Sequence, residues 1–456
     1  MRSRSLVPAG EAHNSTLMTS EHRLKSVPLL AKEWRELFAS RASWFFLLMI
    51  GPLVGHAFIT AIQLYAEASG TGGPAALPQG LTPLDGILAP TLGVYDLAAT
   101  LLLPFVAIRL IAAEKESGAL KLLLQLPGSL RAKVTIKGIV LLGGWLIAGL
   151  PGLIAITLWK SYGGHLYAPE TLNIAIGHLL RTMLSGSIAF AAAAVTESAA
   201  SAAIITLGIT VGTWALDFIA AGRGGWLQQL ANYTPSAALR FFEQGLLRVS
   251  TVIVMLSVII AGFALSIIWL HTGRTLRLKL ISTMILTIIL AGVAVAAASV
   301  RSSWDVSENR RNSFSSLDET LLRQIREPLK ITIFLSPEDP RLTDFEQNIL
   351  KKLRRNLSQL EVVYAASSRT GLFENADEHY GEILYEMGGR KVMERSTIDE
   401  VVLEQIYSLA GISQPERTNE VEFPGYPLAV QPRHASLVFY ILWPLATILA
   451  WWLIRK

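Results

Sequence analysis

The sequence lacks cysteine and is poor in charged residues. Without a thiol, the chain can form neither a disulfide nor a thiolate metal site. Charged residues make up 16% of the 456 residues, and hydrophobic residues make up 51%. This composition is too apolar for an ordinary soluble protein, and long apolar runs account for the excess. The sequence therefore predicts an integral membrane protein.

The motifs of common catalytic and nucleotide sites are also absent from the sequence. It contains no G-x-x-x-x-G-K-[ST] phosphate loop, so any ATP hydrolysis must come from another chain. The eight histidines form no H-E-x-x-H pattern, and there is no G-x-S-x-G elbow. We therefore expect a non-catalytic chain without catalytic, cofactor-binding or metal-binding residues. The basic surplus flanks the apolar runs, as membrane lipids and topology require, and does not favour nucleic-acid binding.

Eight apolar runs are long enough to cross a membrane as helices. Lys and Arg precede the first run and recur in the connection between the second and third runs, whereas residues 66–92 contain none. The positive-inside rule then places both termini in the cytoplasm and residues 301–435 outside it. The predicted fold is a polytopic α-helical protein of the cytoplasmic (inner) membrane with a small extracytoplasmic α/β domain. The predicted spans are residues 43–65, 93–113, 138–159, 178–196, 200–220, 249–270, 280–300 and 436–454.

The segment before the first span divides into two parts. Residues 1–28 are polar and patternless, which predicts a disordered cytoplasmic tail. Residues 29–42 contain the run LLAKEWRELFASR, which predicts an amphipathic helix in the membrane interface. Its apolar face holds Leu30, Trp34, Leu37 and Phe38, and its charged residues Lys32, Glu33, Arg35 and Glu36 lie mostly elsewhere.

A charged, amphipathic stretch from Glu114 to Lys137, EKESGALKLLLQLPGSLRAKVTIK, separates the second and third apolar runs. Leucines recur at helical spacing from Leu120 onward, which predicts a short helix along the membrane surface. Pro127 ends this helix, and Gly118 lets the backbone turn out of the bilayer. A plain basic loop between two spans is the alternative interpretation.

The run E-K-E-S-G-A-L-K-L-L-L-Q-L-P resembles the segment after the second span of type-2 ABC exporter permeases, E-x-E-x-G-x-L-x-x-L-L-x-x-P. The resemblance covers about residues 29–275 and implies a six-helix permease domain at 43–275. It also implies a second permease copy or paralogue, and a separate ATPase subunit that binds ATP and Mg²⁺ and pushes on this loop. The residues that it assigns to ATPase coupling are Glu114, Glu116, Gly118, Leu120, Leu124, Pro127, Arg131 and Lys133.

Residues 301–435 show the pattern of a small α/β sandwich. A strand, a helix and a second strand in succession predict a parallel β-α-β unit, and Gly388-Gly389 predicts the turn of a hairpin. Ser315 or Ser316 can cap the first helix. The predicted elements are strands at 329–335 and 360–366, a hairpin within 381–395, and helices at 343–357 and 398–409.

The opening D-V-S-E-N-R-R-N-S-F-S, Asp305 to Ser315, resembles the start of the gliding-motility-type auxiliary component of ABC transport systems. The later I-x-x-P-L-K-I-T-I-F-L and Y-E-M-G-G-R-K runs agree with it. The resemblance covers about residues 280–456 and implies a domain outside the membrane between the seventh and eighth helices. The chain thus resembles a permease fused to a truncated auxiliary component, because the larger second half of that component is missing.

Ionisable residues inside the spans are costly and often functional. Asp96, Arg109 and Asp217 lie near span ends, whereas His56 lies near mid-depth. We therefore predict a pathway or packing role for His56, facing the bundle interior or a cavity. Between the fifth and sixth spans, Trp226 to Leu247 predicts two short half-buried helices broken at Pro235. Small residues crowd the fourth and fifth spans, which predicts close helix packing or a dimer seam.

Two functions follow from these patterns. The first is a membrane-spanning permease subunit of an ATP-driven ABC export system. The alternative is an envelope scaffold whose external domain binds another extracytoplasmic protein while no solute crosses.

Overall fold

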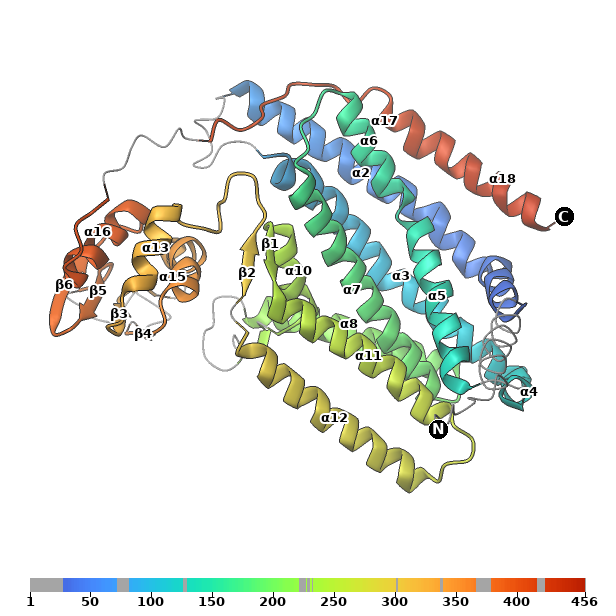
Figure 1. Ribbon diagram of the computed structural model, residues 1–456. Helices are drawn as coiled ribbons and strands as arrows, with labels where there is room; N and C mark the ends of the chain where they lie inside the picture. The colour runs from blue at the N-terminus through green and yellow to red at the C-terminus, as the bar shows by residue number, and fades with distance from the viewer. Residues whose placement is uncertain are drawn as a thin grey trace, which may run out of the picture.

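The computed structural model describes residues 28–71, 82–125, 129–220, 227, 230, 231, 233–300, 302–336, 339–365, 379–415 and 423–455. These residues form a bundle of long helices with a small α/β domain at one end (Figure 1). Eight helices within the described ranges are long and apolar enough to cross a membrane, which confirms the predicted polytopic helical fold. The predicted tail at 1–28 lies outside the described residues, except for its last residue.

The spanning helices follow one another along the chain with short connections. A helix over residues 28–39 precedes them. The spans are α2 (Arg41–Thr71), η2 (Leu84–Leu88) with α3 (Ala89–Glu116), α5 (Leu130–Ala148) with α6 (Leu150–Ser161), α7 (Ala168–Val195), α8 (Ala199–Ala220), α11 (Val249–Leu270), α12 (Leu276–Ala298), and α17 (Ala435–Leu437) with η4 (Val438–Leu442) and α18 (Trp443–Arg455).

Several helices are longer than the apolar runs that predicted them. The fourth span was predicted to start at residue 178, but α7 starts at Ala168 and includes the buried polar residues Glu170 and Asn173. Hydropathy misses these turns because it assumes that polar side chains face water. In α7, Asn173 donates to the Phe242 carbonyl, and Glu170 accepts from the Glu308 amide.

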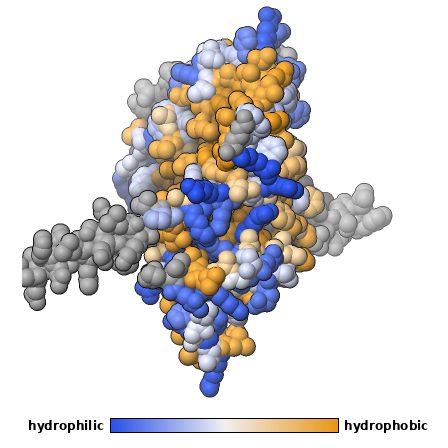
Figure 2. Space-filling model, turned by 90° about the vertical axis from the view of Figure 1, so that its right-hand side faces the viewer, coloured by the Kyte–Doolittle hydropathy of each residue, from blue (hydrophilic) through white to orange (hydrophobic). Residues whose placement is uncertain are grey.

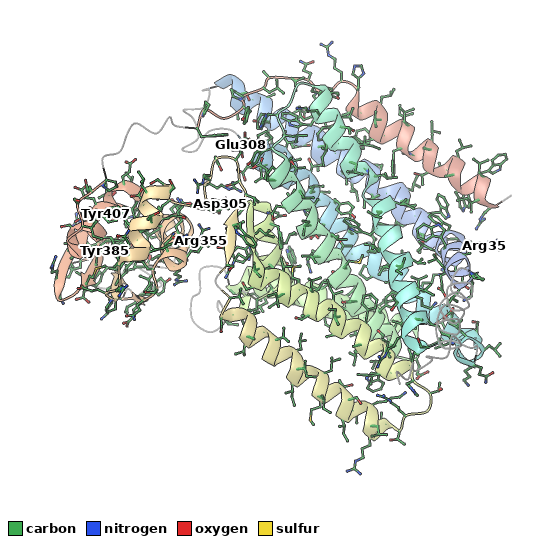
Figure 3. All side chains as sticks on the ribbon, viewed as in Figure 1. Arg35, Asp305, Glu308, Arg355, Tyr385 and Tyr407 are labelled. Atoms are coloured by element: carbon green, nitrogen blue, oxygen red, sulfur yellow. The ribbon has the colours of Figure 1, made fainter. Side chains whose placement is uncertain are left out.

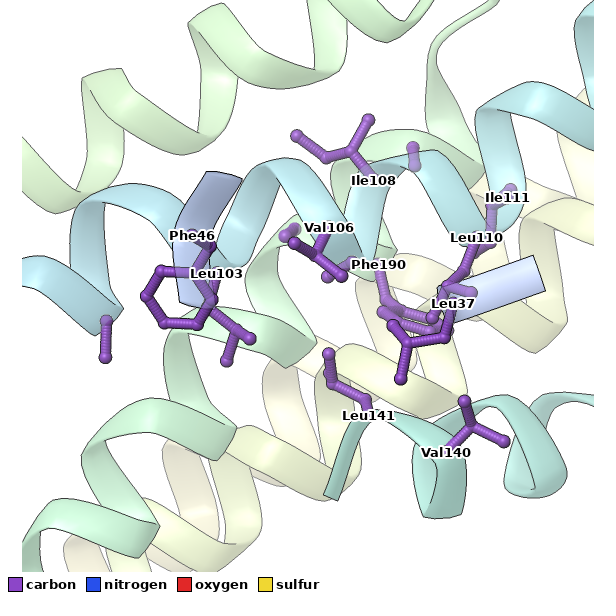
Figure 4. Packing of buried hydrophobic residues seen from close by; sticks show 14 of the residues in the cluster. Leu37, Phe46, Leu103, Val106, Ile108, Leu110, Ile111, Val140, Leu141 and Phe190 are labelled. Carbon is purple, nitrogen blue, oxygen red and sulfur yellow. The ribbon is translucent and has the colours of Figure 1, made fainter. Parts of the chain in front are cut away.

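Helix α7 lies at the centre of the bundle, between α3, α8 and α11 (Figure 1). Its apolar stretch is 72% buried, against 6% for α12. Gly186 of α7 lets α5 pack closely. A Cβ at this position would lie 2.7 Å from Leu141 Cδ2 of α5, which is too close. Figure 4 shows Val106, Val140 and Phe190 meeting in the core beside this contact. Small residues in α7 therefore serve close packing inside one chain.

The last helix of the chain packs against the first span. A Cβ at Gly51 would overlap the Trp443 ring, and one at Gly55 would overlap Phe439. Trp443 Nε1 also donates to the Leu47 carbonyl at 2.8 Å. Two glycines four residues apart on α2 thus form a groove that η4 and α18 fill.

The α/β domain is a four-stranded sheet with helices on one face. Strands β3 (Leu329–Ile333) and β4 (Leu360–Tyr364) pair in parallel, and β5 (Ile383–Met387) pairs antiparallel with β3 and with β6 (Arg390–Glu394), in the order β4-β3-β5-β6. The predicted β-α-β unit and the hairpin are confirmed. The helices are α13 (Ser316–Gln324), α14 (Pro340–Phe345), η3 (Glu346–Leu350), α15 (Lys351–Asn356) and α16 (Asp399–Ala410).

Helix α13 is fixed at both its start and its buried face. Ser315 caps it by accepting from the Asp318 amide at 3.1 Å. Tyr407 of α16 donates to Asp318 Oδ1 at 2.6 Å, inside the domain where Figure 3 labels Tyr385 and Tyr407. The domain therefore has its own core, separate from that of the bundle.

A short ribbon connects the bundle to the domain. Strand β1 (Leu246–Arg248) pairs antiparallel with β2 (Ser303–Asp305). Before it, α10 (Pro235–Glu243) begins at the predicted break, with Thr234 as its cap. The second predicted helix thus ends at Glu243 and the chain continues as a strand, while most of the first predicted helix lies outside the described residues.

Candidate functional site

The bundle has two ends, which we name by what lies there: the α4 end and the α/β end. Helix α4 (Ala119–Gln125) follows α3 after a turn at Gly118, which has a φ of 72°. A residue with a Cβ is strained at this angle, so a glycine suits the turn as predicted. Figure 2 faces the α4 end and shows hydrophilic side chains gathered between hydrophobic surfaces.

Four charged residues form an ion-pair cluster beside α4: Glu33, Glu114 and Lys137, which are buried, and Lys32, which is 41% exposed. Lys137 Nζ lies 2.7 Å from Glu33 Oε2 and 3.0 Å from Glu114 Oε2. It also donates to the Leu110 carbonyl at 2.8 Å. Lys32 Nζ adds a contact of 2.6 Å to Glu114 Oε1. The cluster joins three helices: residues 28–39, α3 and α5.

The cluster corrects two expectations from the sequence. Glu33 was predicted on the charged face of an interfacial helix, and Glu114 was assigned to contact with an ATPase. Their side chains are only 1% and 5% exposed. Burial raises the pKa of Glu33, and the Lys137 ammonium opposes that rise. A buried cation such as Lys137 needs carboxylates close by, so Glu33 and Glu114 are internal partners rather than surface contacts.

The remaining residues of the loop divide between buried and exposed positions. Lys133 is buried and donates to the Leu123 carbonyl of α4 at 2.6 Å. Glu116 and Arg131 are exposed, and Leu120 is half-buried. Leu122, which the sequence did not single out, is 68% exposed. The Leu124 side chain and Pro127 lie outside the described part of the chain.

Helix α3 is also tied to the turn between α7 and α8. Lys115 Nζ donates to the carbonyls of Ala194 and Thr196, both at 2.7 Å. Glu116 Oε1 accepts from the Ala199 amide at 3.4 Å. The α4 end of α3 therefore contacts two further spans through side chains that adjoin the loop.

His56 does not face the interior of the bundle as expected, and its pathway or packing role stays a prediction. Its side chain is exposed on α2, and its Nδ1 lies 3.4 Å from the Tyr440 hydroxyl of η4.

A buried charge cluster that the sequence missed lies between α3 and α7. Asp96 lies 3.8 Å from His178 Nδ1 and 3.8 Å from Arg181 Nε. His178 and Arg181 are 2% and 4% exposed. Glu243 of α10 is close enough to interact with His178, and burial raises its pKa. His178 and Arg181 are three residues apart on α7 and therefore lie on one face of the helix. This spacing is the signal that hydropathy overlooks.

At the α/β end, a loop after β2 fastens the domain to the bundle. We call the contacts of this loop, residues 305–313, the junction. Glu308 lies 2.9 Å from His165 Nε2 and accepts from the Tyr426 hydroxyl at 2.6 Å. The carboxylate of Glu308 raises the pKa of Tyr426 to about 12. The His165 and Tyr426 rings stack with centroids 3.7 Å apart.

Arg311 and Asn312 extend the junction to the starts of other spans. Arg311 pairs with Asp85 of η2 and donates to the Gln244 carbonyl at 3.1 Å. Asn312 Nδ2 donates to the same carbonyl at 2.7 Å. The Glu308 amide donates to Glu170 of α7 at 3.2 Å. The D-V-S-E-N-R-R-N run thus contacts α7, η2 and the segment after α10.

Both ends of α3 are therefore held by charged contacts, and an exposed short helix lies at the α4 end. Residues 27–233 match the family model described as ABC-2 family transporter protein. The ABC-2 match includes α4 and the ion-pair cluster, and it spans somewhat less than half of the chain. It supports an ABC-2-type permease. It ends before α10 and the α/β domain. No curated protein and no solved structure matches the chain.

Proposed function

We propose that this chain is the membrane-spanning permease subunit of an ATP-driven ABC export system in the cytoplasmic membrane. A separate ATPase subunit, which binds ATP and Mg²⁺, docks at the α4 end. The observation that carries the proposal is the exposed α4 within the ABC-2 match: a buried lysine of α5 holds α4, and a second buried lysine holds α5 to α3. The Lys and Arg residues before α2 and after α4 favour a cytoplasmic α4 end.

The contacts suggest how a push on α4 reaches the rest of the bundle. Lys133 holds the α4 backbone to α5, and Lys137 holds α5 to α3 through Glu114 and the Leu110 carbonyl. At its other end, α3 is continuous with η2, and Asp85 of η2 pairs with Arg311 of the junction. A displacement of α4 would therefore move α3 and α5 together rather than bend a free loop.

This arrangement changes which residues we expect the ATPase to touch. Glu114 transmits the movement from inside the ion-pair cluster. The docking surface is formed by exposed residues of the loop: Glu116, Lys121, Leu122 and Arg131.

The test combines two surface changes. We expect the double variant Glu116→Lys with Leu122→Asp to abolish co-purification of the ATPase and stimulation of ATP turnover, because both side chains are exposed and neither supports the cluster. Arg395→Glu in the α/β domain serves as the control and should keep both properties. Unchanged co-purification and turnover in the double variant would refute docking at α4.

A second copy of this chain, or a paralogue, completes the proposed permease. Gly208 and Gly212 lie four residues apart on α8, and a Cβ at either would meet no described atom within 4 Å. Ile204 and Phe218 on the same helix are 72% and 80% exposed. Open glycine pairs of this spacing let transmembrane helices pair closely. We expect Gly212→Leu to prevent crosslinking between two differently tagged copies in membranes.

An envelope scaffold is the second candidate function. Among the described residues, helices cover only one face of the sheet in the α/β domain, which we place outside the cytoplasm. We propose that the other face binds an extracytoplasmic protein. Deletion of residues 303–433 separates the two functions. Loss of an external partner with unchanged ATP turnover would assign recognition to the domain, whereas absence of any ATPase from the purified intact chain would favour the scaffold.

A further inference from the structure

A cleft separates the α/β domain from the ribbon that precedes it. Its volume is about 510 Å³, and it is lined by β2 and the following loop on one side and by α13 and α15 on the other. Figure 3 labels Asp305 and Arg355, which lie on these two sides. Pockets of a few hundred cubic ångströms can hold a small ligand or a headgroup.

The charges that line the cleft do not balance. Asp305 is already bound within its own loop, because it accepts from Ser307, Asn312 and Ser313. Glu319 is shared by Arg323 at 3.3 Å and Arg355 at 3.4 Å. Arg310, the third arginine of the lining, is exposed and has no ion pair or side-chain hydrogen bond to any residue that the structure describes. The lining therefore carries one uncompensated positive charge.

Arg310 also has an unusual backbone. Its φ of 49° is the one positive value at a non-glycine residue in the described part of the chain. Residues with a Cβ disfavour this region, and glycine or asparagine occupies it more readily. Strained residues of this kind tend to occur at functional sites. Strain together with an unpaired guanidinium indicates that the side chain of Arg310 has a use.

The cleft lies close to the membrane surface. Ser302, Ser303 and Trp304 line it and follow within a few residues of the end of α12 at Ala298. Trp304 is 58% exposed, as is common for tryptophan at the headgroup level. The Arg355 side chain is only 20% exposed, so part of the lining is shielded from water.

We propose that this cleft binds a phosphate group. The Arg310 guanidinium is the principal ligand, and Arg355 and the lining serines complete the site. Guanidinium groups bind phosphate oxygens through paired, charge-assisted hydrogen bonds, and hydroxyls add further donors. The phosphate comes either from a lipid headgroup or from a phosphorylated solute. The site does not depend on the ATPase coupling proposed above.

The test uses the full chain in neutral detergent. Calorimetric titration with inorganic phosphate and glycerol 1-phosphate measures solute binding, and native mass spectrometry with phosphatidylglycerol measures lipid binding. We expect Arg310→Gly to weaken binding by about tenfold or more, because it removes the charge while a glycine suits the left-handed backbone. Arg310→Asn, which also suits this backbone, should weaken binding equally. Arg395→Gln removes an exposed arginine outside the cleft and should bind as the wild type does.

Each outcome decides the proposal. Saturable binding of the soluble phosphates that Arg310→Gly weakens supports a solute site. Binding of the lipid alone, with the same sensitivity, supports a headgroup site. Absence of saturable binding, or equal binding by the wild type and a folded Arg310→Gly variant, overturns the proposal. Thermal unfolding of each variant establishes that it is folded.

Discussion

The ion-pair cluster at the α4 end and the junction at the α/β end both join distant parts of the chain through charges. They differ in burial. Glu33, Glu114 and Lys137 are at most 5% exposed, whereas Glu308, His165 and Asp85 are 20%, 33% and 50% exposed. Removing one partner from a buried pair leaves an uncompensated charge, while an exposed pair can exchange its partner for water.

The difference suggests two mechanical roles. The ion-pair cluster lies within the ABC-2 match and makes α3, α5 and the helix at 28–39 move as one unit. The junction connects that unit to a domain outside the match and can open at small cost. Three variants test this contrast, from the largest expected effect to the smallest.

Replacing Lys137 by methionine should give the largest loss of stability. The change leaves the buried Glu33 and Glu114 with only the partly exposed Lys32 as a cation, and the expected loss is about 3–5 kcal/mol in the free energy of unfolding. Denaturant unfolding in mixed micelles measures it. The triple variant Lys137→Met, Glu33→Gln, Glu114→Gln should recover most of the loss, and equal stability of wild type and single variant would show that the cluster is not a buried ionic unit.

Gly118→Ala tests the turn that presents α4. Because Gly118 has a φ of 72°, a Cβ there should cost about 1–2 kcal/mol in local stability, although it would meet no described atom within 4 Å. Hydrogen exchange of residues 119–125 measures the local opening. Gly93→Ala is the matched control, since Gly93 lies inside α3 with similar open space, and this change should stabilise the helix slightly.

Arg311→Ala should have the smallest effect on global stability. The pair with Asp85 is half exposed, so a double-mutant cycle with Asp85→Ala should give a coupling energy of about 1 kcal/mol or less. The Arg311→Ala variant should also show faster hydrogen exchange in residues 302–315, with no change in the bundle. A coupling energy comparable to the Lys137 effect would make the junction as rigid as the cluster and remove the contrast.

The parts of the fold that the sequence predicted well depend on local or strongly periodic signals. The eight spans follow from hydropathy, and the α/β strands from alternation and the Gly388-Gly389 turn. Ser315 was one of two candidate caps because it precedes Asp318 by three residues, and the structure selects it. Each signal lies within a few residues of the feature that it predicts.

The parts that failed depend on partners far away in the sequence. A charged residue on a helix looks the same whether it faces water or a buried partner, and Glu33 lies 104 residues from Lys137. His178 and Arg181 were overlooked although both lie inside the predicted span at 178–196, because hydropathy averages over a run and does not show that the two side chains meet Asp96 of α3. The run from Asp305 to Ser315 stood out by its resemblance, but no local signal indicated the partners of the junction, which come from η2, α7 and the segment after α10.

The packing of the last helix on α2 limits how copies of this chain can assemble. Phe439 and Trp443 occupy the glycine groove of α2, so that groove is closed to any other helix. On the spanning helices that the structure describes, the Gly208 and Gly212 pair on α8 remains open. A contact that uses the same patch on both partners closes on itself with two-fold symmetry. Assembly through α8 would therefore stop at two copies, whereas a free second groove on α2 would permit open chains of subunits within the membrane.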